Sequence, residues 1–407
     1  MNCRFCNAEV KRLFVSLGSS PLANSYLTEE QLHRMEPFYP LEGYVCSNCF
    51  LVQLNEFESP ENIFSNYAYF SSYSDTWLKH AKDYTDKMQE RFGFGSKSLV
   101  IEVASNDGYL LQYFLERGIP VLGIEPAANV AEAARQKGIP TETVFFGAET
   151  ATHLTSEGKC ADLLVGNNVL AHVPNLNDFV DGLRILLKPQ GIITMEFPHI
   201  MRLIEEAQFD TIYHEHFSYF SFLTVKKVFN AHGLTLFDVE ELPTHGGSLR
   251  IYACHADDKS KEISQRITEL EKQEINAGYA DINFYLHFSE KVKSIKRNIM
   301  KFLIQAKEDG KTIAGYGAPA KGNTLLNYCG IKTDFLDYTV DRNPHKQGCY
   351  LPGSRIPIYH PDKIKETKPD YVLILPWNIK DEVIQQMSYI REWGGRFIIP
   401  IPRVKIL

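Results

Sequence analysis

The sequence predicts an α/β protein that carries a small metal-binding module ahead of two Rossmann-like sheets. Short apolar runs alternate with helical patterns from residue 98 onward, and the alternation begins again at residue 312. Apolar runs of this kind are typical of parallel strands, because both faces of such a sheet are covered. Two CxxC pairs precede both regions. At 407 residues the chain is too long for one hydrophobic core, so we expect two or three domains.

The CxxC pairs are Cys3 with Cys6 and Cys46 with Cys49. Four thiolates at this spacing supply a complete tetrahedral shell for a zinc ion. A closed shell leaves no coordination position for a substrate or a water, so the sequence predicts a structural zinc site. The chemistry of the protein is therefore expected elsewhere in the chain.

The bulk composition argues against nucleic acid and membrane partners. The formal net charge is −7, which does not fit a basic surface that binds phosphate backbones. No apolar run approaches the roughly 20 residues needed to cross a bilayer, and the N-terminus lacks a secretory signal. The cysteines outside the CxxC pairs are scattered, so we expect a cytoplasmic protein in a reducing compartment.

The central region begins with an amphipathic helix expected at about residues 75–91. The predicted parallel strands are the apolar runs at residues 99–103, 121–124, 144–146, 163–165 and 192–197, with helices at residues 127–137 and 176–187. An insertion at about residues 198–222 separates them from two further strands, residues 234–239 and 249–253. Five parallel strands followed by a strand pair is the order of the class I methyltransferase sheet.

The C-terminal third starts with a helical pattern and ends with a second sheet. Residues 259–307 are charged and apolar at helical spacing, which predicts one long helix or two. Residues 313–317 then read as the first strand of a smaller Rossmann-like domain. The predicted division is a zinc-binding module (1–65), a methyltransferase domain (66–256), a helical connector (257–310) and a C-terminal Rossmann-like domain (311–407).

The turn after the first central strand suits S-adenosylmethionine. Ala104 and Asn106 replace two of the usual glycines, and Gly108 remains. Glu125 closes the second strand about 20 residues further on, where a carboxylate would accept both ribose hydroxyls. An ordinary βα turn is the alternative, because glycine patterns often match by chance. The candidate cofactor-binding residues are Glu102, Ser105, Asn106, Asp107, Gly108, Glu125, Phe146 and Asn167.

The insertion holds a dense polar cluster, Tyr213-His214-Glu215-His216. A histidine can remove a proton near neutral pH, and the neighbouring groups can hold charge that develops on oxygen. The HxH pattern also permits a metal site, and a partly buried polar loop is the plainer alternative. His172 follows the fourth strand, at the edge where open α/β sheets bind ligands.

Two further turns are candidates for binding an anionic substrate. Residues 245–250 join the last two strands of the central sheet, and their two glycines allow close approach of a ligand. Residues 315–323 follow a strand and open a helix, which suits a phosphate but fits NAD poorly. A purely structural turn is the alternative for each. The candidate substrate-binding residues are His245, Arg250, Tyr316, Lys321, Asp341 and Lys346.

Taken as a set, these motifs resemble the sugar C-methyltransferases that act on nucleotide-linked keto-deoxysugars. The resemblance covers essentially the whole chain. It rests on the two CxxC pairs and on residues 67–75, 102–108, 167–172, 213–216, 245–250, 315–321 and 352–357.

The resemblance implies a SAM-dependent enzyme with a structural zinc and a nucleotide-sugar substrate. In such enzymes a proton is removed from C3 beside a 4-keto group, and the enolate takes the methyl group from S-adenosylmethionine. The residues implied in catalysis are Tyr67, His172, Tyr213, Glu215 and His216. By position, His216 would be the base, Glu215 and Tyr213 would orient it, and His172 would lie near the enolate oxygen.

The resemblance also implies that Lys321 and its turn hold the nucleotide end of the substrate. A monomer is expected to suffice for this arrangement. A zinc-ribbon RNA methyltransferase is a different possibility, which the acidic net charge disfavours. A binding protein without catalysis is another, and such a protein would not bind S-adenosylmethionine.

Overall fold

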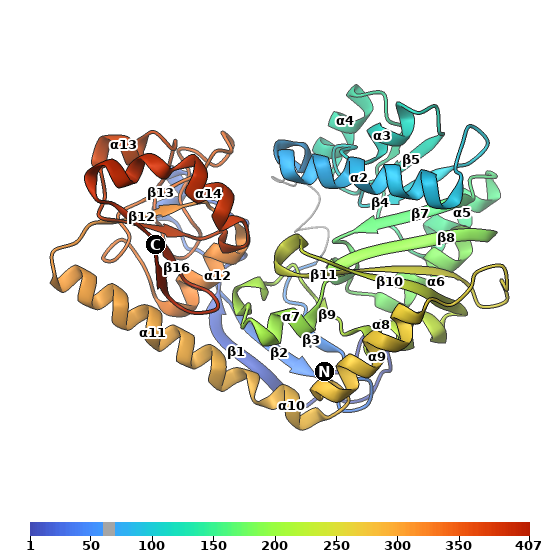
Figure 1. Ribbon diagram of the computed structural model, residues 1–407, viewed down its shortest axis with the longest axis horizontal. Coiled ribbons are helices and arrows are strands. Elements are labelled where there is room, and N and C mark those ends of the chain that lie inside the picture. The colour runs from blue at the N-terminus through green and yellow to red at the C-terminus, as the bar shows by residue number, and fades with distance from the viewer. Residues whose placement is uncertain (60–69) are drawn as a thin grey trace. The chain divides into compact units, whose positions relative to one another are not determined.

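The computed structural model describes residues 1–59 and 70–407, so Tyr67 lies outside the described residues. These residues form two compact units (Figure 1). Unit 1 consists of Met1–Val10, Cys46–Ile200 and Phe217–Asp281, and unit 2 consists of Lys11–Val45, Met201–His216 and Ile282–Leu407. The division into four segments that the sequence predicts stays a prediction.

Unit 1 is built on a sheet with the strand order β10-β11-β8-β7-β4-β5-β6. The pairings from β8 to β6 are parallel, whereas β11 pairs antiparallel with both β8 and β10. The strands are β4 (Val100–Val103), β5 (Val121–Ile124), β6 (Thr141–Glu142), β7 (Ala161–Asn167), β8 (Leu187–Pro198), β10 (Leu234–Leu242) and β11 (Ser248–His255). This is the class I methyltransferase sheet, and the predicted fold class is confirmed.

Helices and short connecting elements complete unit 1. They are η2 (Ser71–Tyr73), α2 (Asp75–Phe92), α3 (Leu111–Leu115), α4 (Ala128–Gln136), α5 (Ala148–Ser156), η3 (Leu170–His172), α6 (Leu176–Leu186), α8 (Phe222–Ala231), η5 (Thr244–Gly246) and α9 (Gln265–Ala277). Two short strands, β3 (Val52–Leu54) and β9 (Ser218–Tyr219), pair antiparallel. The helix α2 packs on the sheet because its buried residues recur at helical spacing, at Ala81, Tyr84, Thr85 and Met88.

Unit 2 contains a smaller sheet with the strand order β14-β13-β12-β15-β16-β17. Its strands are β12 (Ile313–Tyr316), β13 (Thr339–Val340), β14 (Ile358–Tyr359), β15 (Tyr371–Ile374), β16 (Arg396–Ile399) and β17 (Lys405–Ile406). The pairings are parallel except for the antiparallel pair of β16 and β17. The helices are α12 (Ala320–Cys329), α13 (Lys363–Thr367) and α14 (Lys380–Gln386), with η6 (Trp377–Ile379) and η7 (Ser388–Trp393).

The rest of unit 2 comes from three other parts of the chain. An antiparallel pair is formed by β1 (Arg12–Ser20) and β2 (Tyr39–Val45), and the segment between them includes η1 (Glu29–His33). The long helix α11 (Phe288–Glu308) follows α10 (Ile282–Leu286), as Figure 1 shows. Phe14 of β1 stacks on Phe288 of α11 with ring centroids 4.6 Å apart. The remaining elements are α7 (Ile200–Glu205) and η4 (Phe209–Thr211).

Two details differ from the sequence-based expectation. The strand predicted at residues 144–146 lies instead at β6, and the predicted residues Val144 and Phe145 are exposed. β6 is the edge strand of the sheet, so the chain after it has no neighbouring strand on its outer side. The apolar residues that follow β6 are therefore not covered by the sheet. The helical pattern at residues 259–307 is divided into α9, α10 and α11, and α9 ends at Gly278 in a left-handed cap.

Among the described residues, no helix combines the length and the apolar character that a membrane span requires.

The close packing of α6 on the turn before α5 gives a test of the fold. In a helix interior, alanine is normally more favourable than glycine by about 1 kcal/mol. A Cβ at Gly182, however, would lie 2.8 Å from the carbonyl carbon of Gly147 and 2.9 Å from its oxygen. We therefore expect Gly182→Ala to lower the free energy of unfolding by about 1–3 kcal/mol in chemical denaturation.

The matched control is Gly95→Ala, because a Cβ there would meet nothing within 4 Å. That control should leave the stability unchanged or slightly raised. A stabilised Gly182→Ala protein would contradict the packing of α6 on the backbone of Gly147.

Candidate active site

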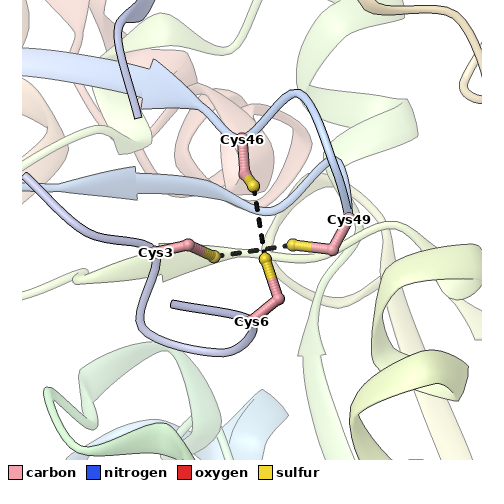
Figure 2. Close-up of side chains that lie close together, drawn as sticks. All are labelled: Cys3, Cys6, Cys46 and Cys49. Atoms are coloured by element: carbon pink, nitrogen blue, oxygen red, sulfur yellow. Dashed lines mark hydrogen bonds between the residues drawn. The ribbon is translucent and has the colours of Figure 1, made fainter. Parts of the chain in front are cut away.

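The four predicted zinc ligands lie together in unit 1. Cys3, Cys6, Cys46 and Cys49 place their sulfur atoms within 4.8 Å of one another, and Figure 2 shows the four side chains converging. Two of the sulfur pairs are 3.5 Å apart. Zinc–sulfur bonds of about 2.3 Å in a tetrahedron require sulfur–sulfur distances of about 3.8 Å. The donor set and its geometry therefore fit a zinc ion with a closed shell.

Each CxxC pair forms the same kind of turn. The amide of Asn7 donates to the carbonyl of Cys3, and the amide of Phe50 donates to the carbonyl of Cys46, both at 3.0 Å. Asn7 and Phe50 both adopt positive φ, at 58° and 66°. The repeated geometry points the two sulfur atoms of each turn in one direction. Such paired knuckles are typical of structural zinc sites.

The zinc-binding turns are fastened to the methyltransferase fold inside unit 1. The guanidinium of Arg4 donates to the carbonyls of Pro174 and Leu54 at 3.0 and 2.7 Å. The hydroxyl of Thr224 in α8 donates to the carbonyl of Cys49 at 3.1 Å. The module is therefore an integral part of unit 1.

The predicted S-adenosylmethionine turn has an unusual backbone. Ala104, Asn106 and Gly108 all adopt positive φ, at 57°, 51° and 75°. The left-handed conformation that glycines usually provide is thus present although two of the glycines are not. Asn tolerates this conformation, whereas Ala adopts it at a cost of about 1–2 kcal/mol. A Cβ at Gly108 would lie 2.1 Å from Cδ1 of Ile139, and the φ of 75° also favours glycine at this position.

Glu125 is held at the end of β5 by backbone amides. Its Oε2 accepts a hydrogen bond from the amide of Asn106 at 3.0 Å, and its Oε1 accepts one from the amide of Ala127 at 2.8 Å. Burial raises the pKa of Glu125, and these two hydrogen bonds act in the opposite direction. The carboxylate is therefore fixed in orientation, with lone pairs left to accept hydrogen bonds from a ligand's hydroxyl groups.

Two buried polar atoms at this turn, the hydroxyl of Ser105 and Oδ1 of Asp107, have no hydrogen-bond partner among the described residues. The carboxyl group of Glu102 is fully buried beside the Tyr109 hydroxyl. Burial raises the pKa of Glu102 well above its ordinary value, and the nearby Tyr109 hydroxyl acts against this shift. Unpaired buried acceptors are costly unless a ligand supplies donors. The ammonium group and hydroxyls of S-adenosylmethionine are such donors, so this turn fits that cofactor.

The other candidates in unit 1 lie at the ends of neighbouring strands. Asn167 ends β7 and donates to the hydroxyl of Tyr109 at 3.1 Å. His172 ends η3, which follows the same strand. His245 accepts a hydrogen bond from the amide group of Asn168 at 2.9 Å. Phe146 lies in the loop before α5 and packs against Phe179.

Arg250 lies in a buried ion pair, and its role in substrate binding stays a prediction. It is only 3% exposed, and its guanidinium lies 2.6 Å from Glu196 on the adjacent strand β8. Burial opposes ionisation of Glu196, but the hydrogen bond from His80 and the charge of Arg250 lower the pKa of Glu196 to about 2. The charge of Arg250 is thus already paired within the protein. The sequence prediction missed Glu196 and His80 because they lie in other elements, far along the chain.

The predicted base loop lies in unit 2 and is almost entirely buried. Nδ1 of His216 lies 3.0 Å from the carbonyl oxygen of Thr211. Tyr213 packs on His216 with ring centroids 4.1 Å apart. Glu215 is 2% exposed and accepts a hydrogen bond from Nδ2 of Asn24 at 2.7 Å. These groups of the loop thus have defined partners, and their catalytic role stays a prediction.

His214 is oriented by the backbone as well. Its Nε2 lies 3.2 Å from the carbonyl oxygen of Pro40, and its ring meets the edge of Tyr39. Burial lowers the pKa of His214. A carbonyl acceptor on Nε2 means that this nitrogen carries the proton in the neutral ring. That assignment disfavours Nε2 of His214 as a metal ligand, the alternative that the HxH pattern left open.

The phosphate-binding turn predicted after β12 is largely occupied by internal hydrogen bonds. The amide of Gly317 donates to the carbonyl of Val340, and the amide of Ala318 donates to Asp341 at 2.7 Å. Lys346 donates to the carbonyl of Ala318 at 2.8 Å. Gly317 has a φ of 88° and leaves no room for a Cβ beside Pro376. Tyr316 donates to Gln386 at 3.0 Å.

Lys321 lies beside a buried carboxylate that the sequence analysis did not single out. Its ammonium donates to Asn378 at 2.8 Å and lies 4.9 Å from the ring centroid of Trp377. The indole of Trp377 donates to Oδ2 of Asp210 at 2.7 Å. Burial lowers the pKa of Lys321, and the charge of Asp210 opposes that change. Burial raises the pKa of Asp210 to about 6, and the charge of Lys321 opposes that increase.

The zinc site gives a test of the N-terminal geometry. A metal bridge between Cys6 and Cys46 closes a segment of 40 residues. Loop-closure entropy for that length is worth about 4 kcal/mol. We expect about one zinc per chain by elemental analysis, and we expect Cys46→Ser to lose the metal and on the order of 4 kcal/mol of stability. Cys160→Ser is the matched control and should keep both; full zinc retention in Cys46→Ser would contradict the site.

Asp210 gives a test by pH. Its pKa rises from an ordinary value of 3.8 to about 6 on folding. The folded state therefore binds the proton more tightly, and the stability of the protein falls as the pH rises through this window. Asp210→Asn removes this dependence. The free energy of unfolding of the variant, minus that of the unchanged protein, should therefore rise by up to about 3 kcal/mol from pH 4 to pH 7. Denaturant titrations at both pH values measure the difference.

The control for this experiment is Asp334→Asn, because Asp334 is exposed. Its effect should be the same at both pH values. If the stability difference between Asp210→Asn and the unchanged protein did not vary with pH, folding would not raise the pKa of Asp210.

Comparison with known proteins places these features in one family. Three family models match in chain order: a "zinc binding domain" over residues 3–64, a "Methyltransferase domain" over residues 77–239 and a "C-methyltransferase C-terminal domain" over residues 243–402. The C-methyltransferase NovU of Streptomyces niveus is 36% identical over 405 residues, which is 100% of this chain and 96% of that protein.

Other similarities cover smaller parts of the chain. A ubiquinone biosynthesis O-methyltransferase of Bartonella bacilliformis is 26% identical over 98 residues, which covers 23% of this chain and 38% of that protein. The structure of a magnesium protoporphyrin IX methyltransferase from Synechocystis PCC 6803 with bound SAM has a TM-score of 0.34 and 16% identity, and covers 44% of this chain and 82% of that one. The full-length match is the informative one, and with the three family models it shows that this chain belongs to the family of SAM-dependent, zinc-binding C-methyltransferases to which NovU belongs.

Proposed function

We propose that this C-methyltransferase acts on a nucleotide-linked 4-keto-6-deoxysugar, removes the proton at C3 and methylates the resulting enolate, in deoxysugar biosynthesis. The observation that carries the proposal is the hydrogen bond between Nδ1 of His216 and the carbonyl of Thr211. A carbonyl oxygen can only accept a hydrogen bond, so Nδ1 carries the hydrogen in the neutral ring. Nε2 then holds the lone pair that a general base needs.

Methylation at carbon needs a base more than methylation at oxygen does. A C–H bond beside a ketone loses its proton only when the charge that develops on the ketone oxygen is stabilised. We assign the proton removal to Nε2 of His216 and the support of this ring to Tyr213 and Glu215. The stacking of Tyr213 and the burial of the loop support the assignment. His172 is proposed to stabilise the enolate oxygen.

The cofactor is proposed to bind at the turn after β4. Glu102 and Asp107 would accept hydrogen bonds from its ammonium group, and Glu125 from its ribose hydroxyls. Oδ1 of Asp107, which has no partner among the described residues, and the fixed oxygens of Glu125 support these roles. Phe146 and Asn167 are proposed to complete the site. When bound, S-adenosylmethionine supplies a methyl group on a positively charged sulfur, so the protein has to align it rather than activate it.

The nucleotide end of the substrate is proposed to bind at the N-terminus of α12 and at Lys321. Helix N-termini attract anions through their amides and dipole. The amides of Gly317 and Ala318 are already bonded internally, so they do not serve this purpose. Asp341 and Lys346 would shape the turn, and the small-molecule substrate would be the partner of a monomeric protein. The net charge of −7 gives no support to an RNA substrate.

The substitution His216→Asn tests the assignment of the base. The Asn side chain can keep a donor toward Thr211 but has no basic nitrogen. We expect methyl transfer to a panel of nucleotide 4-keto-6-deoxysugars to fall by at least about 10²–10⁴-fold. Exchange of the C3 proton with deuterated water should be lost in parallel, as mass spectrometry of the recovered sugar would show.

The control is His153→Asn, whose side chain is 70% exposed in α5. It should retain both activities, and both variants should bind S-adenosylmethionine like the unchanged protein. Retained C3 exchange in His216→Asn would exclude His216 as the base.

A further inference from the structure

A short segment between β1 and β2, Ala23–Leu27, is hydrogen-bonded to the C-terminal part of unit 2 at both of its ends. We call this segment the strap. Asn323 of α12 donates to the carbonyl of Ala23 at 2.6 Å, and the hydroxyl of Tyr26 donates to the carbonyl of Ala318 at 2.5 Å. Leu27 exchanges two backbone hydrogen bonds with Tyr350, at 3.0 and 2.8 Å. The strap is thus fixed on both sides of Asn24.

Asn24 is the member of the strap that meets the base loop. Its Nδ2 lies 2.7 Å from Oε1 of Glu215, and Glu215 is 2% exposed. A carboxylate has no hydrogen to donate, so the amide nitrogen must face it. The distance lies within the normal range for an N–H···O hydrogen bond.

We propose that Asn24 is a positioning residue for the C-methylation reaction: it holds the Glu215 carboxylate in its working orientation through the strap. The inference rests on the proposed function of the base loop. A neutral amide fixes a carboxylate without cancelling its charge, whereas a lysine or arginine would pair with it. Asn24 therefore orients the Glu215 carboxylate without adding a charge of its own.

The structure also argues against a purely structural role for Asn24. The strap already has four hydrogen bonds to the C-terminal part of unit 2 through Ala23, Tyr26 and Leu27. The contact of Asn24 with Glu215 adds little to that attachment. The hydrogen bond from Asn24 instead sets the direction of the buried Glu215 carboxylate. Glu215 directly precedes the proposed base, His216, in the sequence.

The test measures the steady-state kinetics of Asn24→Ala and of the isosteric Asn24→Asp. Loss of a hydrogen bond to a charged group should lower kcat for methyl transfer by about 10- to 100-fold in Asn24→Ala. KM for the sugar and the affinity for S-adenosylmethionine should change by less than about threefold, because the groups that bind them are not touched. Asn24→Asp should be slower still, since it places a second negative charge against Glu215.

A double-mutant cycle with Glu215→Gln separates positioning from general damage. If Asn24 acts through Glu215, Asn24→Ala should have almost no further effect on kcat in the Glu215→Gln protein. Asn327→Ala is the control. This substitution removes two hydrogen bonds in the same unit, to the carbonyls of Asn323 and Pro352, and neither bond involves the base loop. Its kcat should stay within about threefold of the unchanged protein.

The outcomes distinguish this inference from the proposed function. An unchanged kcat in Asn24→Ala, or additive effects in the cycle, would overturn the role of Asn24 while leaving His216 as the base. A fully active Glu215→Gln protein would remove Glu215 from the proposed mechanism, and the role of Asn24 with it.

Discussion

The convergence of four sulfur atoms is the constraint that closes the N-terminal segment of the chain. Cys3 and Cys6 face Cys46 and Cys49 within unit 1, whereas the residues between the pairs, Lys11–Val45, belong to unit 2. That closed segment carries β1, β2 and the strap. A zinc ion held by the four cysteines would join the two ends of the segment that also carries Asn24.

The buried polar groups of the candidate site are held mainly by neutral partners. Backbone carbonyls accept from His214 and His216, backbone amides donate to Glu125, and an amide side chain donates to Glu215. Neutral partners of this kind set the direction of a side chain and the tautomer of an imidazole without adding a charge. The buried pair of Arg250 and Glu196 shows the opposite arrangement, in which the charges satisfy each other.

The sequence was informative where function depends on local pattern. Periodicity predicted the central sheet, and spacing predicted the cysteine cluster, because both follow from neighbouring residues. The turn at Ala104 and Asn106 was weakly signalled, since its left-handed backbone is imposed by the fold and not by glycines. Partners distant in sequence could not be predicted. The contact of Asn24 with Glu215 spans 191 residues, and that of Asp210 with Trp377 spans 167.

Hydrogen–deuterium exchange of the backbone, with and without zinc, tests the dependence of the base loop on the sulfur cluster most directly. If the closed segment fixes the strap, removing the metal should speed exchange at Ala23–Leu27 and at residues 209–216, although no zinc ligand lies in either stretch. The α12 and β12 region should stay protected. Faster exchange confined to residues 1–10 and 46–54 would contradict the account, because the metal would then stabilise only its own turns.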